Sequence, residues 1–193
     1  MSKKIKFVIL STLILLSMSS VTALAYSFLF SGGIKNRPLV FTSNNGFMQE
    51  SRWAIDYATR QWNNKTNTTT FVHNSTQTSK NSYPLDKRDN MNLISRVNLG
   101  YYNNWVMSTR CYSSGDKILE ADINVNLYFS FANNGMAQFY DVQNSLTHEL
   151  GHALGLNHSS NTEATMYGST MKGETKKRDL HSDDLNGYWA IYG

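Results

Sequence analysis

The sequence predicts a single α+β domain behind an N-terminal export signal. Short β-prone runs recur between Leu39 and Leu127, whereas the apolar residues of Phe47–Trp62 repeat at helical spacing. The 193 residues suit one domain with a real core, and aromatic residues at 12% argue against a disordered chain. Neither an internal repeat nor a linker divides the sequence. We therefore expect one mixed unit rather than two domains.

The first 25 residues have the features of a signal peptide. A basic start at Lys3–Lys6 precedes the apolar run Phe7–Leu16, and Ala23–Ala25 has the small-x-small pattern of a cleavage site. We expect cleavage after Ala25, which leaves residues 26–193 as one mature, secreted domain. The alternative is an uncut membrane anchor over Phe7–Phe30, a length that could just span a bilayer although serines and threonines dilute it.

The mature domain begins with one strand and one helix. Leu39–Thr42 is a short apolar, β-prone run, and Ser43–Gly46 has the composition of a turn. The spacing of the following apolar residues predicts a helix from about Gly46 to Asn63. The polar tract Asn63–Thr70 is then expected to be a loop.

Four further runs are strand candidates, and the last is the clearest. They are Thr70–His73, Asn92–Asn98, Trp105–Tyr112 and Ile118–Leu127. Apolar residues in Ile118–Leu127 nearly alternate with polar ones, as in a strand with one buried face. The polar positions are Glu120, Asp122, Asn124 and Asn126. A turn is expected at Asn133–Gly135.

Charge and cysteine content exclude several classes of protein. The net charge is +4, but three of the 18 basic residues and none of the 14 acidic ones lie in the signal, so the mature domain would carry +1. This balance does not favour nucleic acid as a partner. The local basic run, interrupted by Glu174, is interpreted as a solvated loop; it comprises Lys172, Lys176, Lys177 and Arg178. A single cysteine, Cys111, excludes an internal disulfide and the cysteine-rich zinc sites.

The chemistry of the chain is concentrated between His148 and His158. His148 and His152 are four residues apart, so a helix places both imidazoles on one face, where they can bind one Zn²⁺. Glu149 then projects beside the open position of the metal and can accept a proton from a zinc-bound water. Gly155 can end the helix in a left-handed conformation, which returns His158 as a third ligand.

Histidines on a helix face are often simply part of a core. That reading fails here because three of the five histidines of the chain fall within eleven residues. Core histidines also need no glutamate and glycine at fixed offsets. The pattern therefore predicts a three-histidine zinc site that leaves a fourth position open, as catalytic zinc sites do.

The extended motif resembles that of the metzincin metalloproteases, in which three histidines are followed by a turn containing methionine. Met166 lies eight residues after His158, in the position of that turn, and Ser159 follows the third histidine as is usual in the matrixin family. The stretch Leu180–Gly193 resembles the closing matrixin helix. The resemblance implies a twisted, mostly parallel sheet with an antiparallel edge strand, long helices that include the zinc-binding helix, and a C-terminal helix.

The resemblance also implies which residues support the site. Met166 would lie beneath the three histidines, and Gly155 would turn the chain. Asp183 and Asp184 would help to hold the methionine turn. Alternatively, both aspartates could be ordinary N-terminal helix charges favoured by the helix dipole, and the two interpretations are compatible.

The implied function is that of a secreted zinc endopeptidase with one catalytic Zn²⁺. Glu149 would act as the general base and later pass the proton to the leaving amine. A protein or peptide substrate would pair with an edge strand, expected at Ile118–Leu127 or just after it. We expect a monomer without stable membrane association. A metzincin fold retained only for binding or adhesion is the alternative, although an intact Glu149 argues against it.

Some features depart from the pattern of the better-known matrixins. Cys111 lies inside the domain and outside the motif of a cysteine switch, so it is interpreted as a small core residue. Only His73 is available for a second, structural zinc, which is therefore not expected. Gly168 stands where some metzincins have a zinc-binding tyrosine, and Tyr167 is not assigned as a ligand. Calcium is an unpatterned option; the candidate positions are Asp116, Asp122, Asn133, Asn134 and Asp141.

Overall fold

The structure is a computed structural model that describes residues 25–82, 87–100 and 104–193. Except for Ala25, the predicted signal peptide therefore lies outside the described residues. Within the described ranges, none of the helices combines the length and the apolar character needed to cross a bilayer.

Five strands form one sheet in the order β2-β1-β3-β5-β4. The first four strands in this order run parallel, and β4 pairs with β5 in the antiparallel direction at one edge. The strands are β1 (Leu39–Ser43), β2 (Phe71–His73), β3 (Asn92–Val97), β4 (Met107–Ser114) and β5 (Lys117–Asn126). A separate short parallel pair joins β6 (Phe131–Ala132) to β7 (Tyr140–Asp141). The predicted α+β class with a mostly parallel sheet is confirmed.

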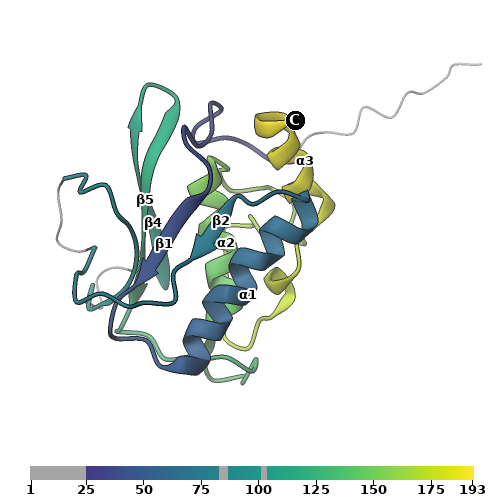
Figure 1. The fold of residues 1–193 in the computed structure, drawn as a ribbon. Helices are drawn as coiled ribbons and strands as arrows, with labels where there is room; N and C mark the ends of the chain where they lie inside the picture. The colour runs from purple at the N-terminus through teal and green to yellow at the C-terminus, as the bar shows by residue number, and fades with distance from the viewer. Residues whose placement is uncertain (1–24, 83–86, 101–103) are drawn as a thin grey trace, which may run out of the picture.

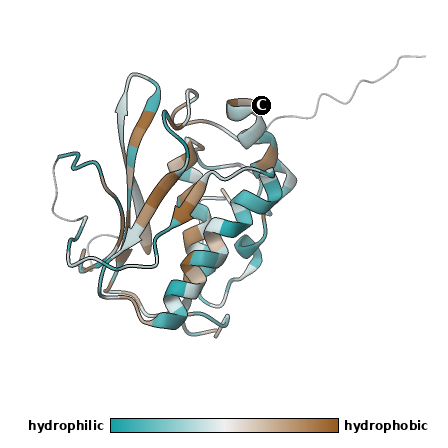
Figure 2. Cartoon of the chain, in the orientation of Figure 1, coloured by the Kyte–Doolittle hydropathy of each residue, from teal (hydrophilic) through white to brown (hydrophobic). Residues whose placement is uncertain are grey.

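The helices pack on one face of this sheet. They are α1 (Gln49–Thr66), α2 (Val142–Leu154), the 3₁₀ turn η1 (Lys176–Arg178) and α3 (Ser182–Tyr192). Figure 1 shows α1 running beside α2, with α3 next to the chain terminus. Strands β1 and β2 are largely apolar in Figure 2, whereas polar residues dominate much of α1. The apolar layer thus lies between the sheet and the helices.

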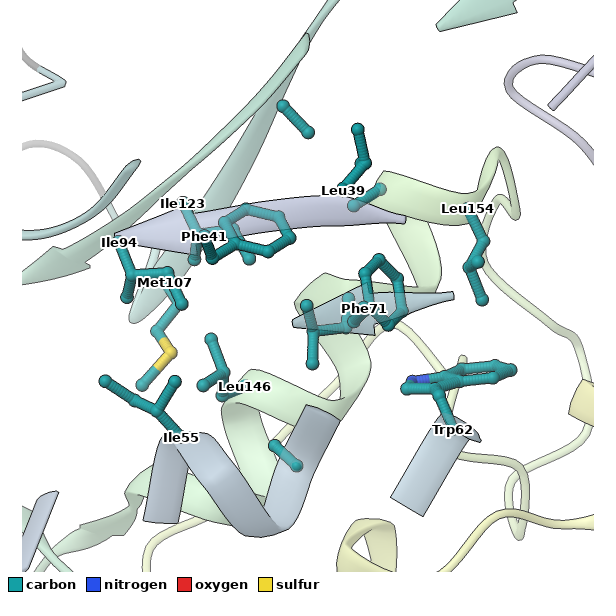
Figure 3. Packing of buried hydrophobic residues seen from close by; sticks show 14 of the residues in the cluster. Leu39, Phe41, Ile55, Trp62, Phe71, Ile94, Met107, Ile123, Leu146 and Leu154 are labelled. Atoms are coloured by element: carbon teal, nitrogen blue, oxygen red, sulfur yellow. The ribbon is translucent and has the colours of Figure 1, made fainter. Parts of the chain in front are cut away.

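Aromatic and aliphatic side chains fill the space between the two layers. Figure 3 shows Ile55 of α1 and Leu146 of α2 pointing toward Phe41 and Ile94 of the sheet. Trp62 is fully buried at the end of α1. Its indole Nε1 donates a hydrogen bond of 2.9 Å to the carbonyl oxygen of Thr147, the residue directly before His148. The core therefore holds in place the segment of α2 that carries His148 and His152.

The first predicted elements agree with the structure to within a few residues. The predicted helix Gly46–Asn63 corresponds to α1, which begins and ends three residues later. It ends at Asn67, which adopts a left-handed φ of 51°. The side chain of Asn63 then accepts hydrogen bonds from the backbone of Thr70 and Phe71. The expected loop is therefore shorter than its composition indicated.

The expectation that Ile118–Leu127 is an edge strand is wrong. β5 lies inside the sheet, between β3 and β4, and its alternating polar side chains are buried as well. Asp122 accepts from the backbone N–H of Leu93 at 2.9 Å, and Glu120 accepts from that of Asp89 at 3.2 Å. Asp122 thus satisfies a backbone donor of the neighbouring strand β3, and Glu120 satisfies one of the segment just before it, so polarity did not indicate exposure here. The edge strand on this side is β4.

Candidate metal centre

The sequence around α2 defines both ends of the helix. Asp141 caps its start, since the carboxylate accepts from the backbone N–H of Asn144 at 2.9 Å. Gly155 ends it with a φ of 104°, and its N–H bonds to the carbonyl groups of the last turn. A Cβ atom at Gly155 would overlap the carbonyl oxygen of Phe30. Glycine is therefore required both by the backbone conformation and by the close approach of the N-terminal segment.

The three predicted ligands come together at the end of this helix. His148 and His152 lie one turn apart, with ring centroids 4.8 Å from each other. His158 follows the glycine turn, and its ring centroid lies 5.3 Å from that of His148 and 4.9 Å from that of His152. One ligand atom of each ring lies within 4.8 Å of the others. Three imidazoles at this spacing form a donor set that fits one zinc ion.

Backbone carbonyl groups orient two of the rings. Nδ1 of His148 lies 2.7 Å from the carbonyl oxygen of Thr165, and Nδ1 of His152 lies 2.8 Å from that of Leu156. A carbonyl only accepts, so each Nδ1 carries the hydrogen and each Nε2 keeps a free lone pair. Burial lowers the pKa of both histidines, and that of His148 lies well below its ordinary value. The neutral form that binds metals is thus favoured.

Glu149 is buried next to the histidines, and Thr109 of β4 contacts it. The Thr109 hydroxyl lies 2.6 Å from Glu149 Oε2 and 3.0 Å from the Glu149 carbonyl oxygen. Burial raises the pKa of Glu149 to about 7, and the Thr109 hydrogen bond opposes this shift. Sequence reasoning missed Thr109, because no spacing relates a strand residue to a helix forty positions later.

Met166 lies beneath the helix of the motif. It is 1% exposed, and a Cβ atom at Gly151 would overlap its sulfur. The backbone N–H groups of Thr165 and Met166 both donate to Asp184 at 2.9 Å. Asp183 accepts a hydrogen bond of 2.6 Å from the hydroxyl of Ser159, next to the third histidine.

The aspartate pair also serves its own helix. Asp184 accepts from the backbone N–H of His181 at 2.9 Å, and the His181 ring accepts from the N–H of Asp183, which makes a capping box for α3. The two interpretations of the pair are therefore compatible in the structure. One carboxylate, that of Asp184, links the turn at Met166 to the start of α3.

The basic run after Met166 is only partly the solvated loop that the sequence predicts, because Lys172 and Lys176 are exposed whereas Lys177 is buried. Lys177 is 1% exposed, and its Nζ donates to the carbonyl oxygens of Tyr167 and Ser169 at 2.5 and 2.8 Å. Arg178 pairs with the buried carboxylate of Asp141 at the start of α2. The spacing of these basic residues follows neither a helix nor a strand period. The sequence therefore does not show which of them is buried, and only the tertiary structure does.

An open cleft of about 670 Å³ lies over the histidines. The strand β4 and the residues before it, including the exposed Trp105, form one wall. The turn Gly168–Thr170 and Lys177 line the other side. A Cβ atom at Gly168 would approach the ring of His158 to 2.8 Å, so this wall passes directly against the third histidine. The arrangement exposes the metal-binding face to an extended ligand.

The remaining polar residues that were weighed as metal ligands have protein partners. The ring of His73 lies 2.7 Å from the carboxylate of Asp56. Asp122 accepts from the backbone N–H of Leu93. Asp141 accepts from the backbone N–H of Asn144 and from the guanidinium group of Arg178. In the described part of the chain, the three motif histidines are the one close group of three or more histidine, cysteine or acidic residues.

Cys111 contacts the same helix from β4. Its Sγ donates to the carbonyl oxygen of His152 at 3.7 Å, and its side chain packs against the hydrophobic core. Burial raises the pKa of the thiol to about 12. Such a protonated, partly buried thiol agrees with the interpretation of Cys111 as a core residue.

Comparisons with known proteins match the same region. A family model described as Matrixin, of the M10 peptidases, matches residues 39–193. Metalloendoproteinase 1-MMP of Arabidopsis thaliana is 49% identical over 53 residues, which are 28% of this chain and 14% of that protein. Stromelysin-1 of Equus caballus is 54% identical over 48 residues (24% and 10%), and matrilysin of Homo sapiens is 45% identical over 47 residues (24% and 18%). The match thus spans less than a fifth of each of these relatives.

Proposed function

The chain belongs to the matrixin family, and from this premise we propose that it is a zinc-dependent endopeptidase that hydrolyses peptide bonds in proteins. The observation that carries the proposal is the convergence of three imidazoles and one buried glutamate at the floor of an open cleft. A structural zinc site would be closed by a fourth protein ligand instead.

His148, His152 and His158 would hold the zinc ion. A zinc ion bound there would supply the Lewis acidity that activates water and polarises the scissile carbonyl group. The carbonyl groups that accept from Nδ1 of His148 and His152 fix the orientation of these rings before any metal binds. Gly155 and Met166 would support the ligands by turning the chain and by filling the space beneath the helix.

Glu149 would act as the general base and then as the general acid. Its Oε2 accepts from Thr109, and its Oε1 makes no hydrogen bond within the described residues, so that oxygen is available to a proton. A pKa raised to about 7 suits a group that must accept a proton from water and release it to the leaving amine. Thr109 would position the carboxylate.

The substrate would lie along β4 rather than along β5. β4 is the last strand of the sheet, and no described strand pairs with its outer edge. Residues from Asn104 to Arg110 line the cleft, so an extended peptide could add to this edge as a further strand. Main-chain hydrogen bonds of this kind would hold peptides of many sequences.

We further propose that the protein acts outside the cell after removal of residues 1–25, as a monomer. This proposal rests on the basic, apolar and small-residue pattern of the N-terminus. N-terminal sequencing of the mature protein tests it. Tyr26 as the first residue is the expected result, and an intact N-terminus would favour the membrane-anchored alternative.

The decisive experiment compares the zinc-loaded wild type with Glu149→Ala on casein, gelatin and a peptide library. We expect the wild type to cleave internal peptide bonds and a chelator to stop it. Glu149→Ala should lower the rate by about 10²-fold to 10⁴-fold or more, because the general base is lost. Zinc content and thermal unfolding should stay unchanged. A variant that keeps both full activity and zinc would refute the role of Glu149, and an inactive wild type that binds zinc would favour the binding or adhesion alternative.

A further inference from the structure

Lys177 is a buried lysine that lines the cleft beside the metal-binding residues. Only 1% of the residue is exposed, yet its side chain borders the same cleft as His148 and Glu149. Its Nζ donates to the carbonyl oxygens of Tyr167 and Ser169. Within the described residues, no carboxylate forms an ion pair with it. An ammonium group has three donors, so among the described residues one donor is left without a partner and the charge has no carboxylate paired with it.

The fold fixes Lys177 in this place. Its backbone N–H donates to the side-chain oxygen of Asn144 at 2.8 Å, and the Asn144 amide group donates to the hydroxyl of Thr170 at 3.3 Å. Lys177 is therefore tied to α2 and to the turn that forms the cleft wall. Burial lowers its pKa to about 8, so the side chain still carries its charge at neutral pH.

A second unpaired donor lines the same cleft. Ser145 is 5% exposed and lies on α2, three residues before His148. Its hydroxyl is buried and has no hydrogen-bond partner among the described residues. A buried hydroxyl without a partner is costly, and a ligand with an acceptor group would relieve that cost. A ligand group that accepts hydrogen bonds and carries negative charge would therefore satisfy both Lys177 and Ser145.

The described residues that line the cleft do not pair with this ammonium group. Glu149 is the one carboxylate among them, and no ion pair joins it to Lys177, although its charge raises the pKa of Lys177. Glu174 lies outside the lining and accepts from the backbone N–H of Met171 at 3.1 Å. Its charge raises the pKa of Lys177 without pairing with it.

We propose that the cleft selects peptides in which one residue flanking the scissile bond is an aspartate or glutamate, whose carboxylate binds Lys177 and Ser145. This inference rests on the proposed peptidase function and assigns Lys177 as a residue that determines specificity. An apolar side chain in the same place would leave the buried ammonium group unpaired. A carboxylate would accept its free donor and supply the missing counter-ion.

A matched peptide series tests the proposal. The peptides are identical except for Glu, Gln or Leu at each of the two positions that flank the cleaved bond. For the wild type we expect kcat/KM to be at least about tenfold higher with Glu than with Gln at one of these positions. Lys177→Met should bring this ratio close to one, and Ser145→Ala should lower it less. Lys177→Arg keeps the charge and should retain the preference.

The control separates specificity from a structural role. Lys176 is the exposed neighbour of Lys177, so Lys176→Met removes the same charge outside the cleft and should keep the wild-type ratio. If Lys177 only braced the cleft wall, its replacement would slow the Glu and Gln peptides equally. An unchanged ratio in Lys177→Met, or a wild type that prefers Leu or treats Glu and Gln alike, would overturn the proposal.

A binding measurement keeps this test independent of turnover. Fluorescence anisotropy with zinc-loaded Glu149→Ala should show tighter binding of the Glu peptide than of the Gln peptide, and Lys177→Met in that background should remove the difference. If the wild type cleaves nothing, the peptidase proposal fails. The binding ratio then still decides whether Lys177 selects an acidic ligand, and equal binding would refute it.

Discussion

The two sides of the cleft treat their polar groups differently. On the α2 side, backbone carbonyl groups accept from the rings of His148 and His152, and Asp184 accepts from the N–H groups of the turn at Met166. On the side formed by the turn Gly168–Thr170 and Lys177, the buried ammonium group of Lys177 forms no ion pair with any carboxylate among the described residues.

This difference separates what a metal needs from what a substrate needs. Zinc ligands must be held in one tautomer and one orientation, so their neighbours are satisfied by the protein alone. A side chain that recognises a ligand must keep a donor free until the ligand arrives, and it destabilises the free protein to that extent. The α2 side should therefore lose stability when altered, whereas the Lys177 side should mainly change selectivity.

The largest loss of stability should follow from Asp184→Asn. The carboxylate is fully buried and accepts hydrogen bonds from three backbone N–H groups. In asparagine an amide nitrogen replaces one of the two oxygens, and this nitrogen cannot accept a hydrogen bond from a backbone N–H group. We expect the free energy of unfolding to fall by roughly 2–4 kcal/mol. Asp183→Asn, which disturbs a single contact with Ser159, is the matched control and should cost less. Chemical denaturation measures both, and equal small losses would contradict the role of Asp184.

A smaller loss is expected for Gly151→Ala, inside the zinc motif. A methyl group there would overlap the sulfur of Met166 and approach Trp62, which are both buried. Methionine can shift more easily than backbone, so we expect a loss of about 1–3 kcal/mol rather than failure to fold. The matched replacement is Ala153→Gly on the same helix, which removes a methyl group without any overlap. A fully stable Gly151→Ala protein would show that Met166 does not pack tightly beneath the helix.

The parts that the sequence predicts well are those in which local spacing determines geometry. The offsets from His148 to Gly155 and His158 imply a helix and its end, and both are found as expected, with the ring of His158 close to those of His148 and His152. The first strand and helix follow similarly from periodicity. The boundary of α1 was misplaced because Asn63 satisfies the following strand with its side chain while it is still helical.

The parts that the sequence does not predict depend on contacts between distant segments. The alternation in β5 predicted a half-exposed strand, because the sequence cannot show that Glu120 and Asp122 are buried and accept from backbone N–H groups of β3 and of the segment before it. Thr109 contacts Glu149 only because β4 packs against α2. Lys177 differs from its exposed neighbour Lys176 only in the direction that η1 gives it.

The smallest expected change in stability is the pH-dependent contribution of Lys177. Burial lowers the pKa of Lys177 from 10.5 to about 8, so the unfolded chain binds this proton more tightly than the folded protein does. Between these values, the unfolded state holds more protons, and stability from this group must rise as pH increases from about 8 to 10.5. Lys177→Met lacks this titration. Unscreened, this shift would correspond to roughly 3 kcal/mol. Because solvent screens part of the charge, we expect the stability of the wild type relative to the variant to increase by roughly 1–2 kcal/mol across that window.

Comparison of the two proteins at each pH removes the contribution of every group that they share. Lys176→Met provides the matched background, because it removes an exposed neighbouring lysine and leaves Lys177 in place. Urea denaturation from pH 7 to pH 10.5 gives the three stability curves. If the wild type and Lys177→Met run parallel, the ammonium group is already compensated in the free protein. The contrast between the two sides of the cleft would then disappear, and with it the physical reason for a substrate carboxylate at Lys177.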